Sequence, residues 1–173
     1  RVHYDFIRFC GTTGSDPREG YAWIPANGDL RENDKCVFVG AAGPMGVMHT
    51  MRAVTSGVPG LSVVGTDLSD ERLANLTKVV GPTAEKNGVP LDIVNTSSTP
   101  LEYGYTYATC LVPVPALVSQ AVDLLAQGGI LNAFAGIPAG TFGDFDLQGI
   151  IERQIFMLGT SGSDVSDMRT VLR

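Results

Sequence analysis

The glycine-rich segment at residues 37–46, VFVGAAGPMG, has the composition of a phosphate-binding turn between a strand and a helix. Gly43 lets the backbone approach a pyrophosphate closely, and Gly46 lets the following helix pack tightly on the strand. The N-terminus of that helix offers unpaired N–H groups and a positive dipole to phosphates. The G-x-G-x-x-G pattern is imperfect, because Ala41 stands where its first glycine is expected.

A carboxylate follows the next apolar run at the spacing that a dinucleotide site requires. Asp67 lies 67 − 46 = 21 residues beyond Gly46, near the expected separation of about 20. Its carboxylate is placed to accept the hydroxyls of the adenosine ribose and to repel a 2′-phosphate, which predicts NAD rather than NADP. The alternative is that Asp67 caps the next helix, but Ser69 already suits that position. Arg72, about one turn into that helix, would neutralise part of the charge.

The remaining reactive side chains give no catalytic or metal-binding pattern. Cys10, Cys36 and Cys110 are widely separated in apolar runs and lack C-x-x-C spacing, which predicts buried, reduced thiols. His3 and His49 are isolated, and we expect each to be structural or solvent-facing. We therefore assign no catalytic residue and no metal ligand to this chain.

The elements that must position these residues alternate along the chain. Short apolar runs that do not alternate with polar residues predict strands buried on both faces, at residues 37–39, 61–64, 91–94, 107–112, 130–135 and 155–158. Helices are expected at residues 44–56, from Ser69 onward, at 115–127 and from near Asp164. The fold class is therefore α/β, with a doubly wound parallel sheet in the strand order 3-2-1-4-5-6.

An internal similarity links the two ends of the chain. Residues 7–16 read IRFCGTTGSD and residues 155–164 read IFMLGTSGSD, with six of ten positions identical. Either both segments converge on a good strand-to-helix turn, or the N-terminal one adds a strand to the sheet. We expect residues 1–34 to form a strand and helix extension packed on a dinucleotide-binding domain at residues 35–173. The apolar run at 155–158 would lie at the sheet edge and pair with a second copy, giving a homodimer or larger assembly, unless the N-terminal strand covers it.

Charge and composition limit the partners. The net charge is −6 and no basic run is present, so neither nucleic acid nor a membrane surface is an expected partner. No apolar stretch approaches the length of a membrane span. The chain starts at Arg1 without a signal peptide, and we expect a cytoplasmic segment of a longer protein.

Three segments in order resemble the medium-chain, zinc-type alcohol and polyol dehydrogenase family: VFVGAAGPMG, VVGTDLSDERL and LLAQGGILNAFAGIP. The resemblance spans about residues 35–173 and is closest to sorbose-1-phosphate reductase-like members. It implies a Rossmann fold that binds NAD, within an enzyme for a small alcohol or sugar-phosphate substrate. It also implies that the catalytic zinc and its ligands belong to a separate catalytic domain. No segment here matches that domain, so we expect the chain alone to be inactive.

The resemblance further implies a set of cofactor contacts. The pyrophosphate would face Gly43, Pro44, Met45 and Gly46, with Ala41 at the first turn. The adenosine would be held by Asp67, Leu68 and Arg72. The nicotinamide end would meet Val112, Pro113 and the backbone of Ala135, Gly136 and Ile137.

Two other functions fit the same pattern. An S-adenosylmethionine-dependent methyltransferase-like domain also places a glycine turn after its first strand and an acid after its second. A non-catalytic NAD(H)-sensing module would bind the same cofactor without a zinc domain. The GPMG helix start and the FAGIP segment favour the dehydrogenase.

Overall fold

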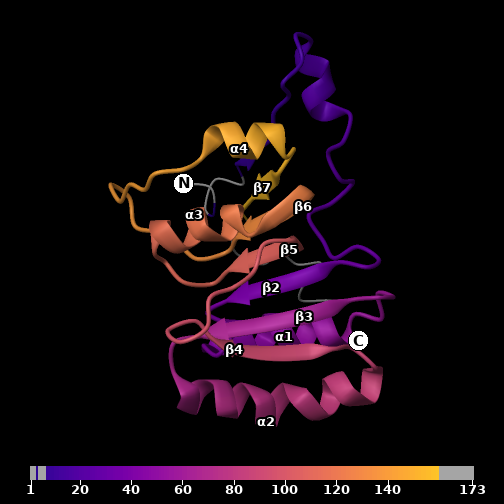
Figure 1. Ribbon diagram of the computed structural model, residues 1–173, viewed down its shortest axis with the longest axis vertical. Helices are drawn as coiled ribbons and strands as arrows, with labels where there is room; N and C mark the ends of the chain where they lie inside the picture. Colours follow the sequence, from indigo (N-terminus) through magenta and orange to yellow (C-terminus); the bar gives the residue numbers. More distant parts are fainter. Residues whose placement is uncertain (1–2, 4–6, 160–173) are drawn as a thin grey trace, which may run out of the picture.

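The computed structural model describes residue 3 and residues 7–159, and a seven-stranded, mostly parallel sheet forms its centre (Figure 1). The strands are β1 Arg8–Phe9, β2 Lys35–Val39, β3 Ser62–Asp67, β4 Leu91–Asn95, β5 Tyr105–Cys110, β6 Leu125–Ala133 and β7 Phe156–Leu158. The helices are α1 Pro44–Thr55, α2 Asp70–Asn87, α3 Pro115–Asp123, α4 Leu147–Glu152 and the 3₁₀ helix η1 Pro17–Tyr21. All six expected strands are present, with bounds shifted by a few residues, whereas α4 was not predicted.

The order across the sheet is β1-β7-β6-β5-β2-β3-β4, which confirms the expected 3-2-1-4-5-6 arrangement of the six parallel strands. The added N-terminal strand is also confirmed. In β1, Arg8 lies opposite Leu158 and Phe9 opposite Met157, in antiparallel pairing with β7. The expectation of an unpaired edge at β7 was therefore wrong, and it no longer argues for pairing with a second copy. The helix expected near Asp164 lies outside the described residues.

The sheet carries an apolar layer on each face. Alternate residues of β2 divide between the layers, since Cys36 and Phe38 pack with α1 and α2, whereas Val37 packs with α3 and α4. This division confirms that the central strands are buried on both faces. The outer strands differ, because β4 is half-buried and β1 is exposed. Because β2 to β7 are parallel, their carboxyl ends lie together at one end of the sheet.

The boundary between α3 and β6 differs from the expected helix at 115–127. The helix ends at Asp123, and Leu125 already begins β6. The reason lies 28 residues further along the chain, where the Arg153 guanidinium donates to the carbonyl oxygens of Val122 (3.1 Å) and Leu125 (2.8 Å). These bonds satisfy carbonyl groups at the helix end and stop its continuation.

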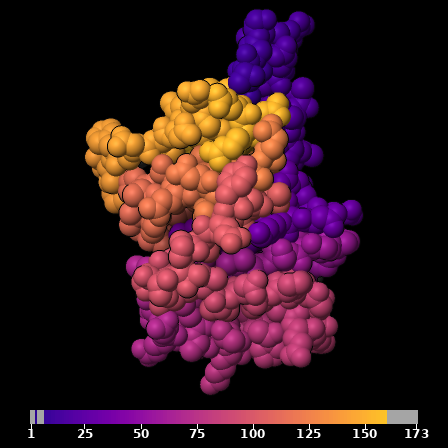
Figure 2. Space-filling view, in the orientation of Figure 1, coloured from indigo at the N-terminus to yellow at the C-terminus, as the bar shows by residue number. Residues whose placement is uncertain are grey.

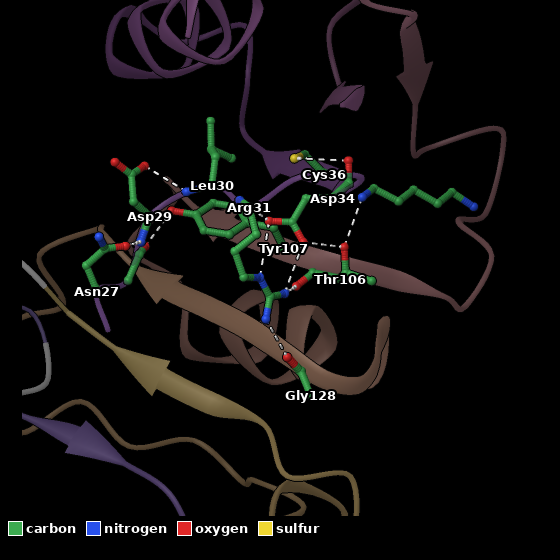
Figure 3. A network of polar contacts seen from close by, with 11 residues as sticks. Asn27, Asp29, Leu30, Arg31, Asp34, Cys36, Thr106, Tyr107 and Gly128 are labelled. Carbon is green, nitrogen blue, oxygen red and sulfur yellow. Dashed lines mark hydrogen bonds and ion pairs between the residues drawn. The ribbon is translucent and has the colours of Figure 1, made fainter. Parts of the chain in front are cut away.

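The segment before β2 is fastened to the starts of the neighbouring strands by a polar network (Figure 3). Asp34 is only 3% exposed and accepts from the Arg31 guanidinium (3.0 Å) and the Thr106 hydroxyl (2.7 Å). Arg31 also donates to the carbonyl oxygens of Thr106 (2.8 Å) and Gly128 (3.0 Å). These bonds tie the segment to β5 and β6, while the part containing η1 projects past the sheet edge (Figure 2).

The three cysteines are free thiols. Cys36 and Cys110 are buried as expected, but Cys10 is only partly buried. Burial, with the charge of Asp34 nearby, raises the pKa of Cys36 to about 12. Within the described ranges, no helix is long and apolar enough to cross a membrane.

Candidate functional site

The turn after β2 is tied to the neighbouring strand β3. The N–H groups of Gly40 and Ala41 both donate to the Thr66 carbonyl oxygen, at 3.0 and 2.8 Å. Gly40 has a φ of +82°, which glycine adopts without the strain that a side chain would add. The residue with left-handed backbone is therefore Gly40. It lies one position before Ala41, where the G-x-G-x-x-G pattern places its first glycine.

Ala41 is accommodated by a glycine on the adjacent strand. It is fully buried, and a Cβ built at Gly65 would lie 3.2 Å from the Ala41 Cβ. Because Gly65 lacks a side chain, the Ala41 methyl group fits against β3. The Ala41 N–H thus bonds to β3 and its methyl group packs on β3, so this residue helps to shape the turn.

The two later glycines have different surroundings. A Cβ at Gly46 would lie 2.3 Å from the Gly40 oxygen and 2.4 Å from the Ala41 carbonyl carbon, so α1 packs against the turn only because residue 46 is glycine. A Cβ at Gly43 would meet only the Gly40 oxygen, at 3.6 Å. The space beside Gly43 is therefore open, as the backbone approach of a pyrophosphate requires.

The N-terminus of α1 points free N–H groups into that space. The helical bonds begin where Val47 donates to the Gly43 carbonyl (2.9 Å), and Gly43 provides no side-chain cap. Pro44 has no N–H, so Met45 and Gly46 carry donors that precede the helical bonds. Two amide donors and the positive end of a helix dipole are the features that bind anions at helix N-termini in general.

The Asp67 carboxylate lies at the end of β3 and is 8% exposed. Its Oδ1 accepts the N–H groups of Leu68 (2.8 Å) and Ser69 (3.1 Å), and the Arg72 guanidinium donates to the same oxygen. Within the described residues, Oδ2 accepts no hydrogen bond. Ser69 caps α2 through its own hydroxyl, as predicted. Of the two carboxylate oxygens, Oδ1 is thus committed to the start of α2 and Oδ2 is not.

The other half of the site follows β5 and β6. The Ala135 N–H donates to the Cys110 carbonyl (3.0 Å), which holds the end of β6 beside the end of β5. A Cβ at Gly40 would lie 2.4 Å from Val112 Cγ2, so the Val112 side chain rests against the turn after β2. The remaining predicted residues here are the exposed Pro113 and the partly buried Gly136 and Ile137.

A largely apolar cavity of about 630 Å³ opens behind this second half. Ala135 and Ile137 line it together with aromatic residues from β1 and the loop before α4, namely Phe9, Phe142 and Phe145. It lies between that loop, α3 and the edge strands. The cavity therefore adjoins the position expected for the nicotinamide.

The parallel strands bring both halves to one edge of the sheet. β2 and β5 are neighbours, and the chain leaves them in opposite directions toward β3 and β6. In open α/β sheets, the carboxyl ends of strands at such a switch point form the ligand-binding crevice. The predicted residues thus lie at the carboxyl ends of β2, β3, β5 and β6, where such a crevice is expected.

An aromatic contact at this edge was missed by sequence reasoning. The rings of His49 in α1 and Phe134 after β6 meet edge to face, with centroids 4.4 Å apart. The ring of His3 lies 5.6 Å from Phe134 in a similar orientation. Burial first, and then the charge of Arg52, lower the pKa of His49. No local pattern indicates this contact, because the partners are 85 residues apart (134 − 49).

Metal chemistry has no evident place in this part of the chain. Among residue 3 and residues 7–159, no group of three or more His, Cys, Asp or Glu side chains is arranged to hold a metal ion. The described residues therefore do not fit a zinc ion.

No protein-family model matches the chain. It is 32% identical over 155 residues to an uncharacterized protein of Escherichia coli, YggP, covering 83% of this chain and 36% of that protein. It is 28% identical over 151 residues to a mannitol-1-phosphate 5-dehydrogenase of Aliivibrio fischeri, covering 80% of this chain and 36% of the relative. The chain thus spans about a third of the length of the curated relatives it matches.

Solved structures of dehydrogenases share the arrangement. A 2R,3R-butanediol dehydrogenase from Bacillus subtilis superposes with a TM-score of 0.64 at 18% identity, over 83% of this chain and 40% of its own. An Escherichia coli alcohol dehydrogenase complexed with NADH superposes with a TM-score of 0.62 at 21% identity, over 84% of this chain and 41% of its own. The chain has a Rossmann fold. A zinc-binding dehydrogenase from Sinorhizobium meliloti bound to NADP superposes with a TM-score of 0.58 at 15% identity, over 76% of this chain and 37% of its own. The fold alone therefore does not select NAD or NADP.

Proposed function

We propose that this chain is the nicotinamide-cofactor-binding domain of a zinc-type alcohol or polyol dehydrogenase, or of a related sugar-phosphate reductase. The observation that carries the proposal is the pairing of two features at one crevice. The free N–H groups at the start of α1 suit a pyrophosphate, and the free Oδ2 of Asp67 suits a ribose hydroxyl. The mannitol-1-phosphate 5-dehydrogenase similarity supports a polyol or sugar-phosphate substrate.

The dinucleotide would lie along the whole of this crevice. The open space beside Gly43 would receive the pyrophosphate, with Met45 and Gly46 donating to it. Asp67 would orient the adenosine ribose, with exposed Leu68 and Arg72 beside the adenine. The nicotinamide would then lie between two segments, Val112–Pro113 and residues 135–137. When bound, the cofactor would supply hydride transfer, and this chain would bind and orient it.

The remaining parts of the proposal concern the whole protein. The substrate contacts, and any catalytic zinc with its ligands, would come from outside these 173 residues. We expect NAD to be preferred over NADP because of Asp67. We also expect a cytoplasmic protein that assembles as a homodimer or larger oligomer, which light scattering would test. That assembly now rests on the family resemblance, since β1 covers the β7 edge.

Calorimetric titration of the 173-residue chain with NADH, ADP-ribose and S-adenosylmethionine tests the proposal. We expect NADH and ADP-ribose to bind and S-adenosylmethionine not to bind. Preferential binding of S-adenosylmethionine would instead support the methyltransferase-like alternative and overturn the proposal. The chain alone should oxidise no alcohol with NAD and zinc, and metal-dependent turnover would contradict the assignment of catalysis to another domain.

A further inference from the structure

The segment that follows β6 is secured at few points, although the proposed nicotinamide contacts lie in it. Residues 134–146 form no helix or strand. In the part of the chain that the structure describes, the Ala135 N–H bond to Cys110 is the backbone hydrogen bond that joins this segment to the sheet. Its position therefore depends on side-chain contacts as well.

The side chain of Phe134 provides such a contact with α1. The ring of His49 approaches it at 4.4 Å between centroids with 70° between the ring planes, a favourable aromatic geometry. α1 begins at the phosphate-binding turn, and Phe134 immediately precedes Ala135. The contact thus joins the helix that would hold the pyrophosphate to the segment that would hold the nicotinamide.

We propose that His49 is a positioning residue that sets the nicotinamide-binding segment through its edge-to-face contact with Phe134. The inference rests on the proposed function. Without the His49 ring, residues 134–137 would sample further arrangements in the free protein. Binding of the nicotinamide would then have to select the competent arrangement, and this selection weakens the apparent affinity. The adenosine and pyrophosphate positions would be unaffected.

Two ligands separate this role from a general structural one. NADH carries the nicotinamide, whereas ADP-ribose has the adenosine, pyrophosphate and second ribose without it. We expect His49→Ala to weaken NADH binding by about three- to tenfold, the range given by one aromatic pair. ADP-ribose binding should change by less than about twofold, which is below that range. NADH fluorescence, which reports on the nicotinamide environment, should shift in the same variant.

Two further variants complete the design. His49→Phe keeps an aromatic ring at this position and should restore the NADH affinity. Met48→Ala alters the adjacent, 62% exposed side chain on the same helix and should leave both affinities unchanged. Thermal unfolding of each variant shows whether it is folded. If His49→Ala does not fold, His49→Gln takes its place, and the ratio of its NADH and ADP-ribose affinities is compared with that of wild type.

The outcomes distinguish the two proposals. An equal loss of both ligands in His49→Ala, or no loss of either, would overturn the positioning role while leaving the proposed function intact. A wild-type chain that binds neither NADH nor ADP-ribose would overturn the proposed function and this inference with it.

Discussion

Replacing Asp67 with asparagine removes one negative charge from the crevice and keeps the shape of the side chain. The amide oxygen can still accept the N–H groups of Leu68 and Ser69, so the start of α2 is retained. A hydrogen bond to a charged acceptor contributes roughly 1.5–3 kcal/mol, against about 0.5–1.5 kcal/mol for a neutral one. The loss of about 1–1.5 kcal/mol corresponds to roughly five- to tenfold weaker binding of NAD.

The same substitution should favour NADP, because it releases Arg72. In the wild-type chain the Arg72 guanidinium pairs with Asp67, and its side chain is 58% exposed. Freed from this pair, the guanidinium can reach a 2′-phosphate, which no longer meets a carboxylate. We therefore expect NADP binding to be unchanged or tighter in Asp67→Asn. Adding Arg72→Met should remove any gain in NADP affinity.

Calorimetric titration of NAD and NADP against both proteins measures the ratio of affinities. Glu71→Gln is the matched control, since it removes one charge from the first turn of the same helix and should leave the ratio unchanged. If the wild-type chain binds NADP as tightly as NAD, the reasoning about Asp67 is wrong. The same holds if Asp67→Asn leaves the ratio unaltered.

Four further predictions concern stability and cofactor binding. Gly46→Ala should lower the free energy of unfolding by about 1–3 kcal/mol or more, because its Cβ would meet backbone atoms at 2.3–2.4 Å. Gly43→Ala places its Cβ in open space, so this variant should unfold like wild type but bind NADH more weakly. Urea denaturation measures the stability of both glycine variants, and titration measures NADH binding. Equal loss of stability in Gly43→Ala and Gly46→Ala would contradict this account. Arg31→Met leaves the 3% exposed Asp34 without its cation and should lower the free energy of unfolding by roughly 2–3 kcal/mol. This value is below that for a fully buried pair because Arg31 is partly exposed. Urea denaturation indistinguishable from wild type would refute it. Finally, the pKa of Cys36 is raised from 9.0 to about 12, so the unfolded chain loses this proton first and the free energy of unfolding should fall from about pH 9 to about pH 12. Cys36→Ala should reduce that slope in urea denaturation at pH 8 and 10.5, and an unchanged slope would argue against it.

Local patterns sufficed for the central sheet, for the glycine turn after β2 and for the place of Asp67 at the end of β3. The apolar runs and glycine turns are short-range signals, and the right-handed parallel connections leave few possible strand orders. The spacing from Gly46 to Asp67 likewise reflects one strand–helix–strand unit. The similarity between residues 7–16 and 155–164 anticipated β1. These predictions depend on neighbouring residues and on topology, both of which the sequence contains.

The errors arose where a distant residue decides the local structure. The run after Pro115 continues its helical pattern through Leu125, but Arg153 from beyond α4 satisfies the carbonyl groups that end α3. Likewise, the departure of Ala41 from the glycine pattern is accommodated by Gly65 on the next strand. In each case the deciding partner lies in another element, so no window of the sequence around the residue shows it.

The pairing of β1 with β7 has a consequence for how the chain folds during synthesis. The pairing of β1 with β7 places Arg8 opposite Leu158, 150 residues further along the chain (158 − 8). It can therefore form only after nearly all of the described chain has left the ribosome. Once β7 has joined the sheet, β1 is linked to it by the 25 residues between Phe9 and Lys35. Closing a loop of this length costs roughly 3 kcal/mol of chain entropy before β1 gains its hydrogen bonds. Until then β7 presents an unpaired edge, and a nascent chain at this stage is open to pairing with another copy.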